Sequence, residues 1–232
     1  MPLSKLPPVD RLKLATVTSV PEWHPEHDAF VPFPVHAWVI QHPDGAILVD
    51  TGVGFGNGAI DEWYQPQSIS LGAALSAVGL APSEIAAVVL SHLHFDHCGQ
   101  QRTLSAPTYV QVTEFEAAKT PGYTVADWAE VPKDRLQLVH GDEDIADGIR
   151  LISTPGHTPG HQSVAIEAGN ERVVLAAQCA YHADELRTGR PASSNLHDES
   201  WAHAAHDSLQ RLRALTPCTV HFSHDLQIMT ME

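Results

Sequence analysis

Four side chains that can bind a metal ion lie close together in the segment Ser91–His97, which reads Ser-His-Leu-His-Phe-Asp-His. Residues two apart on an extended chain point to the same side, so His92 and His94 can bind one ion together. Asp96 and His97 follow just past the expected end of a strand, where the chain turns, and can face a second ion close by. Packing such polar groups into a core would carry a large desolvation penalty. The segment therefore predicts a metal site.

Two later segments each offer one further histidine ligand. The first, residues 154–161 (TPGHTPGH), is a rigid Gly/Pro loop that can hold one imidazole at a fixed geometry, and His157 is the predicted ligand. His161 in the same loop is expected to support the site or the fold rather than bind the ion. The second segment, residues 221–225, ends the last predicted strand. His224 is expected in the loop at the end of this strand, and His221 is expected to face the core or the sheet.

The composition excludes several classes of protein. A chain of 232 residues with 43% apolar and 18% charged residues is typical of a globular protein, and 28 acidic against 13 basic side chains give a net charge of −15. This charge repels phosphate backbones and disfavours nucleic acid as a partner. Three cysteines without CxxC spacing disfavour a disulfide framework or a zinc ribbon. No apolar run approaches the roughly 20 residues of a membrane helix and no secretion signal is recognised, so a soluble cytoplasmic protein without a membrane partner is expected.

Short strands and helices must position the ligands, and turn residues mark their limits. A hairpin is predicted at residues 35–50, a helix at residues 68–79, and a further helix start at the capping box formed by Thr113 and Glu116. The Pro-rich residues before 35 are predicted to be irregular. Further strands are expected at residues 88–90, 108–112, 148–153, 163–168, 173–177 and 220–222, and a last helix at about 199–215. Strands and helices in two similar halves predict the α/β (α+β) class, with two sheets packed together and helices outside.

The motifs together carry a family resemblance. HxHxDH, a later GHTPGH and a late histidine resemble the metallo-β-lactamase superfamily of metal-dependent hydrolases. Within it, residues 42–52, 91–99 and 154–163, with Ala180-Tyr181 and Ser223-His224-Asp225, are similar to the N-acyl homoserine lactone hydrolases. The resemblance implies a single domain over residues 1–232, folded as a four-layer αββα sandwich with metals at one edge of the two sheets. It also implies two divalent ions, expected to be zinc, the first held by His92, His94 and His157 and the second by Asp96, His97 and His224.

The resemblance assigns two supporting positions, one of which departs from the family pattern. Asp50 matches the family's aspartate under the site, which orients a ligand histidine. The family usually places an aspartate that bridges both metals three residues before the position of Tyr181, and this chain has Gln178 there. Because a neutral amide is a poorer zinc ligand than a carboxylate, weaker metal retention and a more acidic bound water are expected. If only one ion binds, three histidines with an open position still form a catalytic zinc site.

The resemblance implies hydrolysis of a lactone ring, with an N-acyl homoserine lactone as the expected small-molecule substrate. A metal-bound hydroxide attacks the ester carbonyl, Tyr181 donates a hydrogen bond to the carbonyl oxygen, and Asp96 can pass a proton to the departing ring oxygen. Six aromatic residues are candidates for the wall of an acyl-chain pocket, of which two are expected to serve: Trp23, Phe30, Phe33, Phe55, Trp63 and Tyr64.

Other functions of the same fold remain open at the level of sequence. They are a β-lactamase, a thioester hydrolase like glyoxalase II, a phosphodiesterase or RNase Z type nuclease, and a non-catalytic member that binds metal. The missing export signal disfavours the β-lactamase, and the scarcity of Lys and Arg near the motifs disfavours phosphate or glutathione substrates. The native metal, the acyl-chain preference and a homo-oligomeric state are left open.

Overall fold

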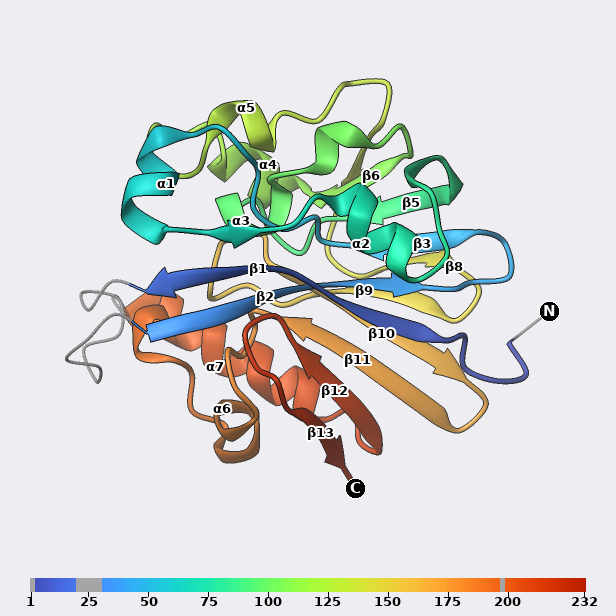
Figure 1. Ribbon diagram of the computed structural model, residues 1–232. Helices are drawn as coiled ribbons and strands as arrows, with labels where there is room; N and C mark the ends of the chain where they lie inside the picture. The colour runs from blue at the N-terminus through green and yellow to red at the C-terminus, as the bar shows by residue number, and fades with distance from the viewer. Residues whose placement is uncertain (1–2, 20–30, 197–198) are drawn as a thin grey trace. The chain divides into compact units, whose positions relative to one another are not determined.

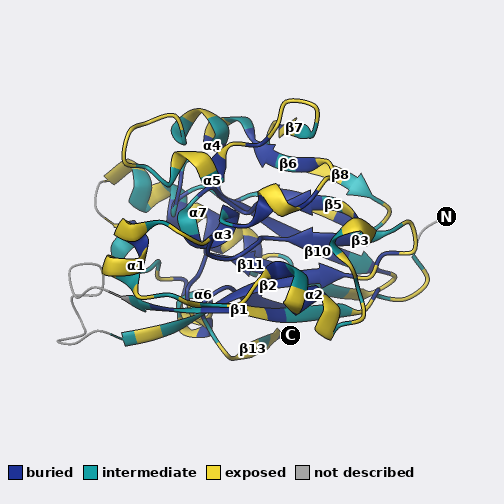
Figure 2. Ribbon diagram, turned by 45° about the horizontal axis from the view of Figure 1, so that its top comes forward, coloured by how far each residue is buried: buried dark blue, intermediate teal, exposed yellow. Residues whose placement is uncertain are grey.

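The computed structural model describes residues 3–19, 31–196 and 199–232. The chain divides into two compact units. The first unit comprises residues 7–110 and 115–138, and the second unit comprises residues 1–6, 111–114 and 139–232. Each unit is built mainly around one β-sheet with accompanying helices (Figure 1). The strands are largely buried, whereas helices and loops carry much of the exposed surface (Figure 2).

The first unit contains a seven-stranded sheet in the order β4-β1-β2-β3-β5-β6-β7. Its strands are β1 (Val9–Ser19), β2 (Val31–Ile40), β3 (Ala46–Val49), β4 (Gln67–Ser68), β5 (Ile85–Val89), β6 (Thr108–Gln111) and β7 (Leu136–Val139). The predicted hairpin is confirmed, since β2 pairs antiparallel with β3 and Trp38 lies opposite Val49. β5 pairs parallel with both β3 and β6, so the carboxyl ends of these strands meet at one edge of the sheet.

The prediction of an irregular segment before residue 35 is wrong, because β1 is a strand of 11 residues. Leu12 and Leu14 are buried and Lys13 between them is exposed, which is the alternation of a strand with one face on a core. A bulge between Lys13 and Ala15 then shifts the register against β2. Prolines on both sides hide this short alternation when the sequence is read alone.

Helices and 3-10 turns accompany the first sheet: α1 (Gly58–Tyr64), α2 (Leu71–Ala77), α3 (Phe95–Cys98), α5 (Ala126–Ala129), η1 (Pro82–Glu84) and η2 (Gln101–Thr103). α2 confirms the helix predicted at residues 68–79, with shorter limits. The Ser70 side chain caps it by accepting from the Ala73 N–H, and the chain leaves it at Gly79 with a φ of 79°. Leu71 and Leu75 of α2 are fully buried in a core with residues of β1, β2, β3 and β5.

The second unit contains a six-stranded sheet in the order β13-β12-β11-β10-β9-β8. Its strands are β8 (Glu143–Ala146), β9 (Ile149–Ser153), β10 (Gln162–Ala168), β11 (Glu171–Ala177), β12 (Cys218–Phe222) and β13 (Ile228–Met231). They confirm the strands predicted at residues 148–153, 163–168, 173–177 and 220–222. β11 and β12 pair parallel and the other described pairs are antiparallel, so β11 and β12 also end at one edge.

The second unit holds α6 (Ala183–Thr188), η3 (Ser193–Asn195) and α7 (Glu199–Arg213). α7 confirms the last predicted helix, and its Leu209 and Leu212 pack in one core with Val220 and Phe222 of β12. α4 (Val112–Ala117) begins before Thr113, and the Glu116 carboxylate accepts from the Lys119 ammonium at 2.6 Å. The predicted capping box is therefore wrong.

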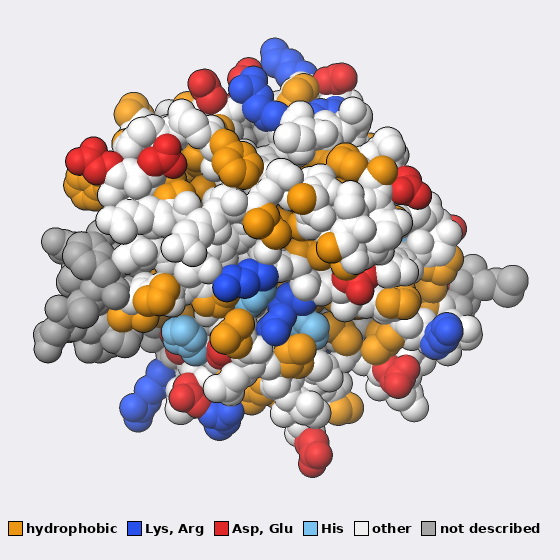
Figure 3. All heavy atoms as spheres, viewed as in Figure 1, with side chains coloured by type: hydrophobic (Ala, Val, Ile, Leu, Met, Phe, Trp, Pro, Cys, Tyr) orange, Lys and Arg blue, Asp and Glu red, His pale blue; other side chains and the backbone are white. Residues whose placement is uncertain are grey.

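Charged side chains are dispersed on the visible surface. On the face drawn in Figure 3, Lys and Arg side chains lie in separate places among acidic, apolar and neutral ones. Within the described residues, no helix combines the length and apolar character that spanning a bilayer requires. The three cysteines are buried, and none of them forms a disulfide.

Close backbone contact fixes the loop after β3 against the segment that carries the candidate ligands. The Gly99 N–H donates to the Gly52 carbonyl at 2.8 Å. A Cβ atom added at Gly99 would lie 2.0 Å from the Gly54 nitrogen and 2.6 Å from the Gly52 oxygen. The atoms in contact belong to the backbone of both segments, so neither can move aside as a flexible side chain can. Glycine is therefore required for close approach rather than for backbone conformation.

We predict that Gly99→Ala lowers the free energy of unfolding by about 3 kcal/mol, because overpacked backbone must separate. Urea denaturation followed by circular dichroism measures this difference. Gly58→Ala is the matched control, since no atom lies within 4 Å of its added Cβ and Ala favours the helix that begins there. Equal stability of Gly99→Ala and Gly58→Ala would contradict the packing argument.

Candidate metal centre

A buried carboxylate organises the ligand segment of the first unit. Asp50 follows β3 and is fully buried, with a left-handed φ of 64°. Its Oδ1 accepts from the Ser91 N–H at 2.7 Å, and its Oδ2 accepts from the Ser91 hydroxyl at 2.8 Å. His97 Nδ1 lies 2.8 Å from the same Oδ2. The carboxylate thus holds both ends of the segment that carries the four candidate ligands.

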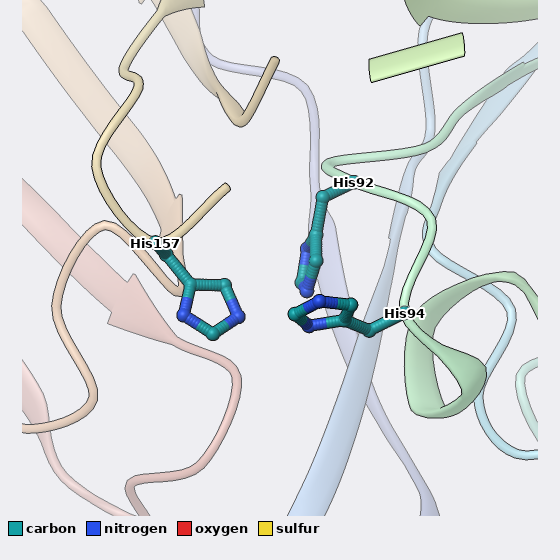
Figure 4. A group of neighbouring side chains, drawn as sticks. All are labelled: His92, His94 and His157. Atoms are coloured by element: carbon teal, nitrogen blue, oxygen red, sulfur yellow. The ribbon is translucent and has the colours of Figure 1, made fainter. Parts of the chain in front are cut away.

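His92 and His94 lie side by side on this segment. Their ring centroids are 4.7 Å apart in an edge-to-face arrangement, and the two rings are drawn in Figure 4. A ligand nitrogen of His92 lies within 4.8 Å of one of His94, a spacing that one ion can bridge. Ser91 Oγ lies 3.1 Å from His92 Nδ1 and thereby holds the ring from behind. This pair confirms that residues two apart on the segment face the same side.

α3 brings Asp96 and His97 together. Both side chains are buried, and His97 Nε2 lies 3.4 Å from Asp96 Oδ2. The ligand atoms of the two residues lie within 4.8 Å of each other. With Asp50 on Nδ1, His97 presents Nε2 on the side of Asp96. One nitrogen and one carboxylate oxygen therefore converge where an ion can sit.

The charges around the two histidines shift their pKa values in opposite directions. Burial acts to lower the pKa of His97, but the negative charges of Asp96 and Asp50 and their hydrogen bonds raise it to about 10. Burial lowers the pKa of His94 to about 4, with Asp96 opposing this shift and His97 adding to it. In the metal-free first unit His97 is therefore an imidazolium at neutral pH and His94 is neutral. A cation beside Asp96 is favoured, whether a proton on His97 or a metal ion.

The aromatic residues proposed for a pocket wall differ in how far they are exposed. Phe55 and Trp63 are 57% and 62% exposed. Phe33 and Tyr64 are half-buried against one apolar cluster of the first unit, and the Tyr64 ring lies 4.3 Å from that of Phe95. Burial and then the charge of Asp96 raise the pKa of Tyr64. Trp23 and Phe30 lie outside the described residues.

His161 holds the second unit's Gly/Pro loop together. Its Nε2 accepts from the Gln178 backbone N–H at 3.1 Å, and its Nδ1 lies 2.9 Å from Thr154 Oγ1. Both ring nitrogens are therefore engaged within the fold. In the same loop the Gly160 N–H donates to the buried Glu114 carboxylate at 3.1 Å.

His157 stands at the tip of this loop, and its ring is drawn in Figure 4. Its Nδ1 lies 3.2 Å from Asn195 Oδ1 and 3.3 Å from the Tyr181 hydroxyl. The Tyr181 ring stacks at 5.7 Å on that of His224, which is 5% exposed. Tyr181, His157 and His224 thus lie together at one edge of the second sheet. Asn195 was not expected from the sequence, since a single asparagine in a polar turn carries no motif.

Gln178 follows β11 at the same edge. Ala177 before it has a left-handed φ of 51°, and its carbonyl accepts from the Ser223 N–H at 3.2 Å, which places Gln178 beside the residues that end β12. The Gln178 side chain is 5% exposed, and its Oε1 has no hydrogen-bond partner among the described residues. An unsatisfied buried oxygen costs about 1–3 kcal/mol, so a group outside the chain is the natural partner for it. A bound cation would satisfy this oxygen.

We predict that the charged His97 makes the metal-free protein sensitive to alkaline pH. The pKa of His97 is raised from its usual 6.5 to about 10, so its contribution to stability is complete below pH 6.5 and is lost as pH rises through 10. The free energy of unfolding of chelator-treated protein should fall over this window by up to about 5 kcal/mol.

Urea denaturation across this pH range measures the total loss of stability. Asp50→Asn removes one of the two charges that raise the pKa of His97, so its loss should be smaller and should end at a lower pH, while the exposed control Asp134→Asn should lose as much as the wild type. A loss in Asp50→Asn equal to that of the wild type would contradict the assigned role of Asp50.

Comparison with known proteins identifies the family. Residues 30–224 match the model of the metallo-beta-lactamase superfamily. An N-acyl homoserine lactonase of a Bacillus species is 29% identical over 208 residues, which cover 84% of this chain and 82% of the relative. The N-acyl homoserine lactonase AttM of Rhizobium radiobacter is 32% identical over 176 residues, covering 65% of this chain and 66% of the relative.

Solved structures share the fold. A Bacillus thuringiensis AiiA variant with N-decanoyl-L-homoserine at its active site superposes with a TM-score of 0.82 at 24% identity, over 96% of this chain and 94% of that one. An N-acyl homoserine lactone hydrolase with N-hexanoyl-L-homoserine at its catalytic metal centre gives a TM-score of 0.79 at 25% identity, over 97% and 95% of the chains. The predicted α/β class and the resemblance to these hydrolases are confirmed. Because the family model spans most of the chain and the fold is shared nearly end to end, the chain belongs to the metallo-β-lactamase superfamily of hydrolases.

Proposed function

We propose that the chain is a metal-dependent hydrolase that opens the lactone ring of N-acyl homoserine lactones. The observation that carries the proposal is the ligand chemistry, which forms two candidate sets: His92, His94 and His157, and Asp96, His97 and His224. We assign one divalent ion to each set, with zinc as the metal, because imidazole and carboxylate ligands suit it. We also propose that residues 1–232 form a single catalytic domain.

The bound ions would supply a water of lowered pKa and would polarise the ester carbonyl. Asp50 orients His97 by holding its Nδ1, which leaves Nε2 as the ligand atom. The Tyr181 hydroxyl donates a hydrogen bond to the carbonyl oxygen as negative charge develops on it. Asp96 accepts the proton that the attacking water loses and passes it to the ring oxygen as the ester C–O bond breaks. Water thus adds across that bond, and the product is a hydroxy acid.

Charge and surroundings support a neutral substrate with an apolar chain. The net charge of −15 disfavours phosphate and glutathione substrates, whereas an N-acyl homoserine lactone carries no charge. Phe33, Tyr64 and Phe95 form an apolar cluster within the unit that carries Asp96, and we assign the acyl chain to it. The buried free thiols agree with a reducing compartment, and we propose the cytoplasm.

We predict chelator-sensitive lactone opening with a kcat/KM of about 10⁴ M⁻¹s⁻¹ or more. Proton release at neutral pH from acyl homoserine lactones of several chain lengths measures it, with zinc-loaded and chelator-treated protein side by side. His92→Ala should lose at least about 100-fold, because it removes a ligand. His203→Ala is the control, since His203 is exposed on α7. Absence of turnover by fully metallated protein would reject the lactonase proposal and direct the assay to β-lactams and thioesters.

We predict that Gln178→Asp tightens zinc binding about tenfold or more, because a carboxylate replaces a neutral amide beside two cations. Competition with a chromophoric chelator measures the dissociation constant. Gln227→Asp adds the same charge at an exposed position of the same unit and should leave zinc affinity unchanged. Unchanged zinc retention in Gln178→Asp would refute the placement of Gln178 at the bridging position.

A further inference from the structure

In the second unit, an amide oxygen and a phenol oxygen both lie near one ring nitrogen of His157. His157 Nδ1 lies 3.2 Å from Asn195 Oδ1 and 3.3 Å from the Tyr181 hydroxyl oxygen. An amide oxygen can only accept a hydrogen bond, whereas a phenol hydroxyl can accept or donate. The two neighbours therefore favour different tautomers of the imidazole. Asn195 requires a proton on Nδ1, but Tyr181 can donate to Nδ1 and place the ring proton on Nε2.

The tautomer decides whether His157 can bind a metal ion. A neutral imidazole binds through the nitrogen that carries no proton, and its other nitrogen usually donates to an acceptor behind it. With Nδ1 facing Asn195 and Tyr181, Nε2 is the nitrogen left for an ion. His157 is therefore ready to bind only when Nδ1 carries the proton.

The burial of the Asn195 side chain fits a role in holding this proton. It is 2% exposed, although it ends the short 3-10 turn η3 and its neighbours Ser193 and Leu196 are exposed. Burying an amide in a surface turn is unfavourable unless its polar atoms are used. Its Oδ1 is used by His157, and its Nδ2 has no hydrogen-bond partner among the described residues. The side chain is thus turned inward toward His157 and not to solvent.

We propose that Asn195 is a positioning residue that holds the proton of His157 on Nδ1 and so keeps Nε2 available for the metal ion. Asn195 acts against Tyr181, whose hydroxyl would otherwise donate to Nδ1 and stabilise the tautomer that cannot bind. The hydroxyl proton of Tyr181 is thereby reserved for the substrate. This inference rests on the proposed function, because it takes His157 as a ligand and Tyr181 as a donor to the substrate.

Zinc affinity tests the inference without any lactone. We expect Asn195→Ala and the near-isosteric Asn195→Leu to weaken zinc binding about tenfold, because both remove the acceptor. Asn195→Asp keeps an acceptor oxygen and should restore wild-type affinity or better. Ser193→Ala in the same turn is the matched control and should bind zinc like the wild type. Circular dichroism establishes that each compared variant is folded.

A double variant separates this role from a merely structural one. If Tyr181 stabilises the wrong tautomer once Asn195 is gone, Asn195→Ala combined with Tyr181→Phe should bind zinc more tightly than Asn195→Ala alone. A role in packing predicts equal or weaker binding in the double variant, and that result would overturn the inference. Equal zinc affinities of Asn195→Ala and Ser193→Ala would overturn it as well. A chain that shows the expected zinc pattern yet opens no lactone would leave the inference standing and reject the proposed function.

Discussion

The buried carboxylate of Asp50 is the constraint on which the ligand segment depends. A fully buried charge is tolerated only when hydrogen bonds and an opposite charge satisfy it, and Asp50 obtains these from the Ser91 backbone, the Ser91 hydroxyl and His97. The partners stand at the first and last positions of the segment that holds His92, His94 and Asp96. The contacts that satisfy this carboxylate therefore also close the loop and orient its candidate ligands. The same contacts of Asp50 thus serve both the folding of this segment and the placement of its candidate ligands.

Both units place their reactive residues at the ends of parallel strand pairs, and both use backbone strain there. β3 and β5 lead to Asp50 and to Ser91, and β11 and β12 lead to Gln178 and to His224. At each edge a residue other than glycine has a left-handed φ, namely 64° at Asp50 and 51° at Ala177. Such conformations cost about 1–3 kcal/mol and persist only where surrounding contacts impose them. The chain turns sharply at these points, so the side chains leave the sheet at its edge.

Periodicity and motif spacing were enough to predict much of the architecture, but isolated contacts were not predictable. Strands such as β10 and β11 are apolar and bounded by turn residues. The spacing of the histidines in the segment Ser91–His97 is typical of metal binding. β1 was missed because its alternation is interrupted by a bulge and flanked by prolines. The capping box at Thr113 failed because the helix begins one residue earlier and Glu116 pairs with Lys119. Asn195 could not be found, since its significance comes from a contact with His157, 38 residues away.

The distribution of charge explains why such neutral contacts matter in this chain. The proposed site residues of the first unit include the carboxylates Asp96 and Asp50, whereas those of the second unit are imidazoles, a phenol and the amides of Gln178 and Asn195. In the proposed function, a carboxylate at position 178 would attract a bound cation strongly and would tolerate some disorder in the other ligands. With an amide there, affinity depends more on each imidazole being held in the correct tautomer before the ion arrives. The neutral Gln178 and the buried Asn195 are therefore linked: where charge does not retain the metal, preorganised hydrogen bonds must do so.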